Sequence, residues 1–107
     1  MTFAVLWLAG AERDLEEIAD YIAEHDSPAS ARHVVEKILA PAQSLSRFPE
    51  AGSYPHELAG LGNHEFRQVF FKPYRLIYRI AGKKVYVYLV ADGRRDMQSL
   101  LARRLLR

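Results

Sequence analysis

Hydrophobic and polar residues in the first half of the chain recur with the spacing of amphipathic helices. Leu15, Ile18, Ala19 and Ile22 fall on one helical face, and most of the nearby acidic residues fall on the other. The pattern therefore predicts a helix over residues 11–25.

A second helix is predicted after a short connection. Ser27 can cap it, and Pro28 fits the first helical position, where no N–H partner is needed. Apolar residues at helical spacing continue it to about Phe48: Ala31, Val34, Val35, Ile38, Leu39, Ala42 and Leu45. Pro41 lies inside this run, so we expect a kink or a break near residues 38–40. Short spacing makes the two helices antiparallel neighbours.

The second half of the chain alternates with a period of two, which is typical of strands. Strands are predicted over residues 65–71, 74–80 and 85–90. Gly82, in the turn between the last two, tolerates the positive φ that a short hairpin requires. Alternation puts Leu76, Tyr78 and Ile80 on one face and Arg75, Ile77 and Arg79 on the other. Because arginines alternate with Ile77 on the second of these faces, that face is not formed by core residues alone.

The remaining segments complete an α+β fold. Residues 3–8 are apolar and predict a strand buried on both faces, and residues 53–63 contain Pro55, Gly60 and Gly62 and predict an irregular, exposed loop. Leucines between Met97 and Leu105 indicate a short C-terminal helix. The order β-α-α-β-β-β-α predicts one domain over residues 1–107, with the helices on one face of a three- to four-stranded, mainly antiparallel sheet.

Eleven apolar positions are predicted to be mostly buried. They are Leu15, Ile18, Ile22, Val34, Val35, Ile38, Leu76, Tyr78, Val85, Val87 and Leu89.

Composition narrows the class of protein. The chain has 107 residues, half of them hydrophobic, and no cysteine, which excludes disulfides and thiolate metal sites. No apolar run approaches the roughly 20 residues that span a bilayer. We expect a cytoplasmic protein that does not enter a membrane. The four histidines are scattered, and no catalytic triad or glycine-rich phosphate loop is present, so no metal or cofactor is predicted.

Charge is divided unevenly along the chain. Residues 1–65 hold 4 Lys/Arg and 11 Asp/Glu, a net charge of −7, whereas residues 66–107 hold 11 and 2, a net charge of +9. The split indicates an acidic or polyanionic partner for the second half, or two charged faces that only solvate the protein.

Several short motifs, in this order and spacing, resemble the RelE/ParE family of type II toxin–antitoxin (plasmid stabilisation) toxins. They are Asp14-Leu15-xx-Ile18-Ala19-xx-Ile22, Ser27-Pro28, Leu45-xx-Phe48-Pro49, Phe66-Arg67, Tyr74-Arg75-Leu76-Ile77-Tyr78 and Gly93-Arg94-Arg95-Asp96. The resemblance covers nearly the whole chain. It implies a small α+β toxin that a co-expressed antitoxin wraps to form a hetero-oligomer. With the basic second half in view, we expect an acidic, amphipathic antitoxin segment over the sheet and the helical hairpin.

The family divides by mechanism. RelE-like members cleave messenger RNA in the ribosome, and the resemblance places Arg67, Arg75 and Arg95 on positions that are basic in those nucleases. Their tyrosine on the last helix falls on Leu101, which cannot act as acid or base. A second basic position falls near Gln68 or Val69, and Asp92 stands where many relatives carry histidine.

The Gly93-Arg94-Arg95-Asp96 run before a leucine-rich helix looks more like the ParE branch, whose members poison DNA gyrase. This branch is the first hypothesis, with target-binding residues Arg67, Arg75, Arg79, Arg94 and Arg95. A ribosome-dependent endoribonuclease is the alternative, and a nucleic-acid-binding module without toxicity is a third. The arginines could instead pair with Glu65 or other carboxylates. Asp96 is expected to stabilise the last helix, because an acidic side chain is favourable near a helix N-terminus.

Overall fold

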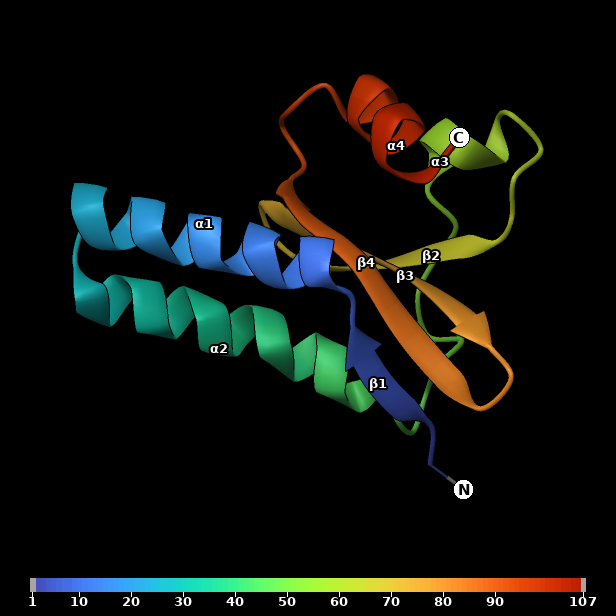
Figure 1. The fold of residues 1–107 in the computed structure, drawn as a ribbon, viewed down its shortest axis with the longest axis horizontal. Coiled ribbons are helices and arrows are strands. Elements are labelled where there is room, and N and C mark those ends of the chain that lie inside the picture. The colour runs from blue at the N-terminus through green and yellow to red at the C-terminus, as the bar shows by residue number, and fades with distance from the viewer. Residues whose placement is uncertain (1, 107) are drawn as a thin grey trace.

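The computed structural model describes residues 2–106, which form four strands and four helices (Figure 1). In chain order they are β1 Ala4–Trp7, α1 Ala9–His25, α2 Pro28–Ser44, α3 His56–Ala59, β2 Phe66–Phe71, β3 Tyr74–Ala81, β4 Lys84–Asp92 and α4 Met97–Leu105. The sheet order is β1-β4-β3-β2, with β1 parallel to β4 and the other pairs antiparallel. The predicted α+β fold is confirmed.

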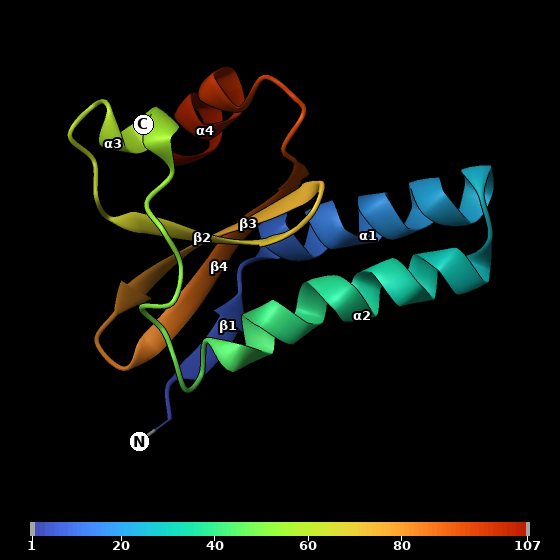
Figure 2. The same ribbon diagram turned by 180° about the vertical axis from the view of Figure 1, so that it is seen from behind.

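Helices cover both faces of the sheet, not one face as predicted. The helical hairpin of α1 and α2 lies on the first face, and α3 and α4 lie together on the second (Figures 1 and 2). Two apolar clusters result. The first contains Ile38, Leu45, Leu76, Tyr78, Val85 and Val87, and the second contains Leu58, Phe66, Ile77, Leu89, Leu100 and Leu101. Helix α4 packs on the second face because Ile77 and Leu89 form an apolar area there, against which Leu100 and Leu101 are buried.

The predicted alternation along β3 is confirmed. Leu76 and Tyr78 pack in the first cluster, Ile77 packs in the second, and Arg75 shares the face of Ile77. A register shift between Ile77 and Tyr78 puts an extra β4 residue opposite them. Because of this bulge, Leu89 joins the second cluster although Val87 lies in the first.

Helix α2 begins where the sequence predicts but ends earlier. The Ser27 side chain accepts a hydrogen bond from the Ser30 N–H at 3.0 Å, and Pro28 opens the helix. No break occurs at Pro41, and the helix ends at Ser44 rather than Phe48. Ile38, Ala42 and Leu45 are buried on either side of the proline. Their packing against the sheet holds the helix together despite the lost hydrogen bond.

Strand β1 is an edge strand with one exposed face, which corrects the predicted burial on both faces. Phe3, Val5 and Trp7 pack partly against the first cluster, whereas Ala4 and Leu6 point away from it and are exposed. Helix α4 covers the centre of the second face and does not reach β1.

Burial matches the prediction in the sheet better than in the helical hairpin. Ile38, Leu76, Tyr78, Val85, Val87 and Leu89 are buried, but Leu15, Ile18, Ile22, Val34 and Val35 are only partly buried. The hairpin projects past the margin of the sheet, so part of its apolar stripe lacks a covering layer (Figures 1 and 2).

Helix α3 lies inside the segment that the sequence predicts to be irregular and exposed. Leu58 on this single turn is only 1% exposed, because it packs in the second cluster. Within residues 2–106, no helix combines the length and apolar character needed to cross a membrane.

Candidate functional site

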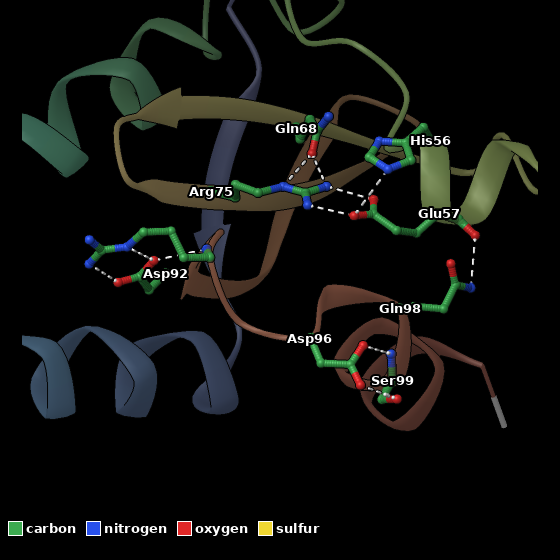
Figure 3. A network of polar contacts seen from close by, with 9 residues as sticks. His56, Glu57, Gln68, Arg75, Asp92, Asp96, Gln98 and Ser99 are labelled. Atoms are coloured by element: carbon green, nitrogen blue, oxygen red, sulfur yellow. Dashed lines mark hydrogen bonds and ion pairs between the residues drawn. The ribbon is translucent and has the colours of Figure 1, made fainter.

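The second face of the sheet holds a buried polar network around Arg75 (Figure 3). The Arg75 guanidinium donates from Nη1 and Nη2 to the two carboxylate oxygens of Glu57, each at 2.8 Å, and from Nε to Gln68 Oε1 at 2.9 Å. Arg75 is only 7% exposed. The hydrogen bonds from Arg75 lower the pKa of Glu57 from 4.5 to about 2. The network therefore holds a fixed ion pair, already complete without a ligand.

Four elements build this network. Strand β3 supplies Arg75, the neighbouring β2 supplies Gln68, and α3 brings Glu57 over them. The Gln98 amide on α4 donates to the Glu57 carbonyl oxygen at 3.3 Å. Gly93 leaves space for the Arg75 side chain, because a Cβ at that position would lie 2.7 Å from Arg75 Cδ. The glycine of the Gly93-Arg94-Arg95-Asp96 motif thus has a packing role.

Arg67 lies on the opposite face of the sheet from Arg75 and anchors a loop. Its guanidinium donates to the carbonyl oxygens of Glu50 and Gly52 at 3.3 and 3.0 Å and lies 4.6 Å from the centre of the Tyr54 ring. With Arg79 it lines a polar cavity of about 350 Å³. The Tyr88 hydroxyl raises the pKa of Arg79. Arg67 and Arg79 thus share a cavity at the outer end of β2 and β3.

Arg94 and Arg95 line a different cavity, of about 470 Å³, between α1 and the end of β4. The Arg94 guanidinium donates from Nε and Nη2 to the two carboxylate oxygens of Asp92, at 3.0 and 2.6 Å, and these hydrogen bonds lower the pKa of Asp92. Arg95 is exposed, and no hydrogen bond or ion pair to its side chain occurs within residues 2–106. The cavity also presents Tyr21 and Tyr74 over a floor of apolar side chains, Ile18, Ile22, Val90 and Ala91.

The five predicted site arginines are therefore distributed over three places. Two flank the cavity by β2, two flank the cavity by α1, and Arg75 is buried between the sheet and α3. Among these, Arg95 combines exposure with a side chain that has no protein partner in the described residues. Its guanidinium is the one best placed to meet an external anion.

The family model for "ParE toxin of type II toxin-antitoxin system, parDE" matches residues 5–97. This chain belongs to the ParE toxin family. It is thus a toxin of a type II toxin–antitoxin system, as the resemblance implies.

Two solved structures share the fold of the toxin. One is described as a chromosomal ParDE toxin–antitoxin system from P. aeruginosa, with a TM-score of 0.71, 18% identity, and coverage of 85% of this chain and 96% of that one. The other is the RelBE2 toxin–antitoxin complex of Mycobacterium tuberculosis, with a TM-score of 0.56, 23% identity, and coverage of 86% and 99%. Among curated proteins, none matches the toxin.

Leu101 of the toxin, the position implied for a nuclease tyrosine, is fully buried in the second cluster. The carboxylate that contacts Arg75 is Glu57, whose pKa is about 2, and the His56 side chain, 3.6 Å from that carboxylate, is 87% exposed. Asp92 is bound to Arg94. Within residues 2–106, no group of three or more acidic or histidine side chains is arranged to hold a metal ion.

Sequence reasoning missed Glu57, Gln68 and Asp14 as partners of arginines. Asp14 accepts a hydrogen bond from the Val90 N–H at 3.1 Å and pairs with Arg104 at 2.9 and 3.1 Å, which ties α1 to α4. The Asp14 of the helix motif was a visible signal, since an acid on the sheet side of an amphipathic helix needs a partner. Nothing in the sequence indicated that Glu57 lies over Arg75, 18 positions later.

Proposed function

We propose that the toxin arrests growth by inhibiting DNA gyrase, and that a cognate antitoxin neutralises it in the cytoplasm. The observation that carries the proposal is the state of the second face of the sheet. Its central cation is already neutralised by Glu57, and Leu101 is buried in the adjacent core.

Cleavage of RNA requires cations gathered around one phosphate and a side chain that transfers protons. Arg67, Arg75 and Arg95 lie in three separate environments and cannot bind one phosphate in this arrangement. Without a positioned acid or base, proton transfer loses typically ~10²–10⁴-fold in rate. This separation supports the gyrase hypothesis over the endoribonuclease alternative.

The cavity beside α1 is the best candidate for the surface that meets the target. The Arg95 guanidinium has no hydrogen-bond or ion-pair partner among residues 2–106 and can form a pair of hydrogen bonds with a carboxylate or phosphate. Tyr21, which is 63% exposed, and Tyr74 add aromatic surface on either side. Arg67, Arg79 and Arg94 are proposed as secondary target contacts, and Arg75 contributes by supporting the second face.

Antitoxin partnership is supported by the two structural neighbours, which are described as a toxin–antitoxin system and a toxin–antitoxin complex. The partly exposed apolar stripe of the hairpin is consistent with a surface that a partner covers. We propose that toxin and antitoxin form a hetero-oligomer.

A gyrase supercoiling assay with matched arginine variants tests this proposal. Purified toxin should block supercoiling, and Arg95→Ala should require roughly tenfold more protein, because the free guanidinium is lost. Arg103→Ala is the control, since Arg103 is also exposed but lies on α4 outside the cavity. Normal supercoiling at toxin concentrations well above those of gyrase would contradict the proposal.

A further inference from the structure

We propose that the cavity beside α1, which Arg94 and Arg95 flank, receives a protein segment of gyrase and not DNA. In this segment an apolar side chain lies on the cavity floor, and a neighbouring carboxylate pairs with Arg95. The inference rests on the gyrase inhibition proposed above. It adds which component of the gyrase–DNA complex the toxin recognises, and by what chemistry.

Most of the charge in this cavity is already paired inside the toxin. Asp92 accepts hydrogen bonds from the Arg94 guanidinium at 3.0 and 2.6 Å. Asp14, deeper in the cavity, accepts hydrogen bonds from the Arg104 guanidinium at 2.9 and 3.1 Å and a further one from the backbone N–H of Val90. These carboxylates are therefore satisfied, and Arg94 is tied to a carboxylate of the toxin.

The two remaining charged side chains have opposite signs. Glu17 on α1 and Arg95 after β4 line the cavity and are exposed, and neither side chain makes a hydrogen bond or ion pair within residues 2–106. A nucleic acid brings one phosphate per nucleotide and would meet a single unpaired cation beside an unpaired carboxylate. A protein segment can instead offer one carboxylate to Arg95 and a basic side chain or water to Glu17. The charges therefore favour protein over DNA.

The floor of the cavity is apolar. Ile18 and Ile22 of α1 line it together with Val90 and Ala91 of β4, and Figure 1 shows the end of β4 next to α1. The two isoleucines are only partly buried, so an apolar side chain on this floor would remove further apolar surface from water. The cavity volume of about 470 Å³ is typical of pockets that enclose a ligand. The sugar–phosphate backbone of duplex DNA has no apolar side chain for this floor.

An aromatic ring at the rim is held in a fixed orientation. Tyr21 is 63% exposed, and its ring stacks on the His25 ring with 4.0 Å between the ring centres and 20° between their planes. A ring held in this way loses little freedom when a partner packs on it, and tyrosine is frequent among the residues that dominate protein interfaces. An unpaired nucleobase could also stack on Tyr21. The charges of Glu17 and Arg95 therefore decide between the two kinds of partner.

Photocrosslinking of the toxin to the complete gyrase–DNA complex tests the proposal. Tyr21→p-benzoylphenylalanine puts a photoreactive group at the rim without changing a buried residue. We expect a crosslink to a gyrase peptide in which an apolar residue lies close to Asp or Glu, identified by mass spectrometry. Arg103→p-benzoylphenylalanine is the matched control, since Arg103 is exposed on α4 outside the cavity, and it should not form that crosslink.

Exchange of charge between toxin and gyrase supplies an independent arm. Arg95→Glu should weaken binding to gyrase roughly tenfold or more, because two carboxylates then face each other. Replacing the crosslinked carboxylate of gyrase with lysine should restore the affinity of this variant to within about threefold of the original pair. Arg103→Glu is the control and should change affinity less than about twofold. Both arginines are exposed, so both variants should unfold like the wild type.

The outcomes separate this inference from gyrase inhibition itself. Blocked supercoiling together with crosslinks to DNA, or to a gyrase peptide without an acidic residue, would overturn the inference and leave the inhibition standing. Wild-type affinity of Arg95→Glu for gyrase would do the same. Crosslinks between two toxin molecules would assign the cavity to self-association and overturn the inference. If the toxin neither binds gyrase nor blocks supercoiling, the proposed function and this inference both fail.

Discussion

Glu57 on α3 and Arg75 on β3 form a two-pronged ion pair, with both nitrogen–oxygen distances at 2.8 Å and each side chain 9% exposed. The Gln68 side-chain oxygen accepts a hydrogen bond from Nε on the remaining edge of the guanidinium. The arginine that the family resemblance associates with a nuclease phosphate is thus paired with a carboxylate of the toxin itself. We expect its contribution to stability to be large.

The first prediction concerns this pair. Arg75→Ala should lower the free energy of unfolding by about 3–5 kcal/mol, because it leaves the Glu57 carboxylate buried without its partner. Arg95→Ala, at an exposed position, should stay within about 0.5 kcal/mol of the wild type. Urea unfolding of the two variants measures the difference.

A double variant serves as the control for this prediction. Glu57→Leu combined with Arg75→Met removes both charges and should recover much of the lost stability. Equal stability of Arg75→Ala and Arg95→Ala would mean that the ion pair does not hold α3 on the sheet.

The second prediction is a pH dependence. The pKa of Glu57 is about 2 in the folded toxin, below its ordinary value of 4.5. The unfolded chain therefore takes up the proton first as the pH falls. The stabilisation, on the order of 3 kcal/mol, is present above pH 4.5 and is lost as the pH falls from there towards 2.

Subtracting the Glu57→Gln variant isolates this effect, because Asp92 and Asp96 also have lowered pKa values and titrate in both proteins. The difference in free energy of unfolding between wild type and variant should shrink between pH 5 and pH 2. A difference that is constant over this range would contradict the assignment.

The third prediction separates two isoleucines that the sequence treats alike. Ile38 is 2% exposed in the first cluster, so Ile38→Ala should cost about 2–5 kcal/mol. Ile18 is only partly buried and lines the cavity beside α1, so Ile18→Ala should cost about 1 kcal/mol. Chemical denaturation measures the free energy of unfolding of both variants. A larger loss for Ile18→Ala than for Ile38→Ala would contradict this packing.

The fourth prediction concerns Tyr78, which is fully buried. Its hydroxyl donates to the Pro49 carbonyl at 2.6 Å and accepts from the Gly52 N–H at 3.0 Å, and burial raises its pKa. Tyr78→Phe should lower stability by about 1–3 kcal/mol, because two buried backbone groups lose their partner. Tyr21→Phe, at an exposed tyrosine, is the control and should unfold like the wild type.

The four strands, the two long helices, the C-terminal helix and the strand alternation could be predicted from the sequence, because they depend on local periodicity. The strand alternation assigned Arg75 and Ile77 to the face opposite Leu76 and Tyr78, as the structure confirms. Gly82 has the positive φ that its turn requires.

Features that depend on tertiary neighbours could not be predicted. Helix α3 has four residues, too few for a helical period to be visible. The position of β1 at an edge follows from the parallel pairing with β4, which no local pattern encodes. The partial exposure of Ile18 and Ile22 follows from the projection of the hairpin past the sheet.

The separation of the arginines also emerged only in three dimensions. Arg67, Arg75 and Arg95 look equivalent along the sequence. In the structure Arg67 anchors a loop, Arg75 is buried in an ion pair, and Arg95 makes no side-chain hydrogen bond or ion pair within the described residues. The cavity beside α1, and not a nuclease site at Arg75, is therefore the candidate surface for the target.

The most direct test of gyrase inhibition without RNA cleavage is to assay one preparation of purified toxin in two reactions. The first follows plasmid supercoiling by gyrase, and the second maps the 5′ ends of messenger RNA on translating ribosomes. We predict blocked supercoiling and no new RNA ends. Codon-phased cuts in the messenger RNA together with normal supercoiling would contradict the account.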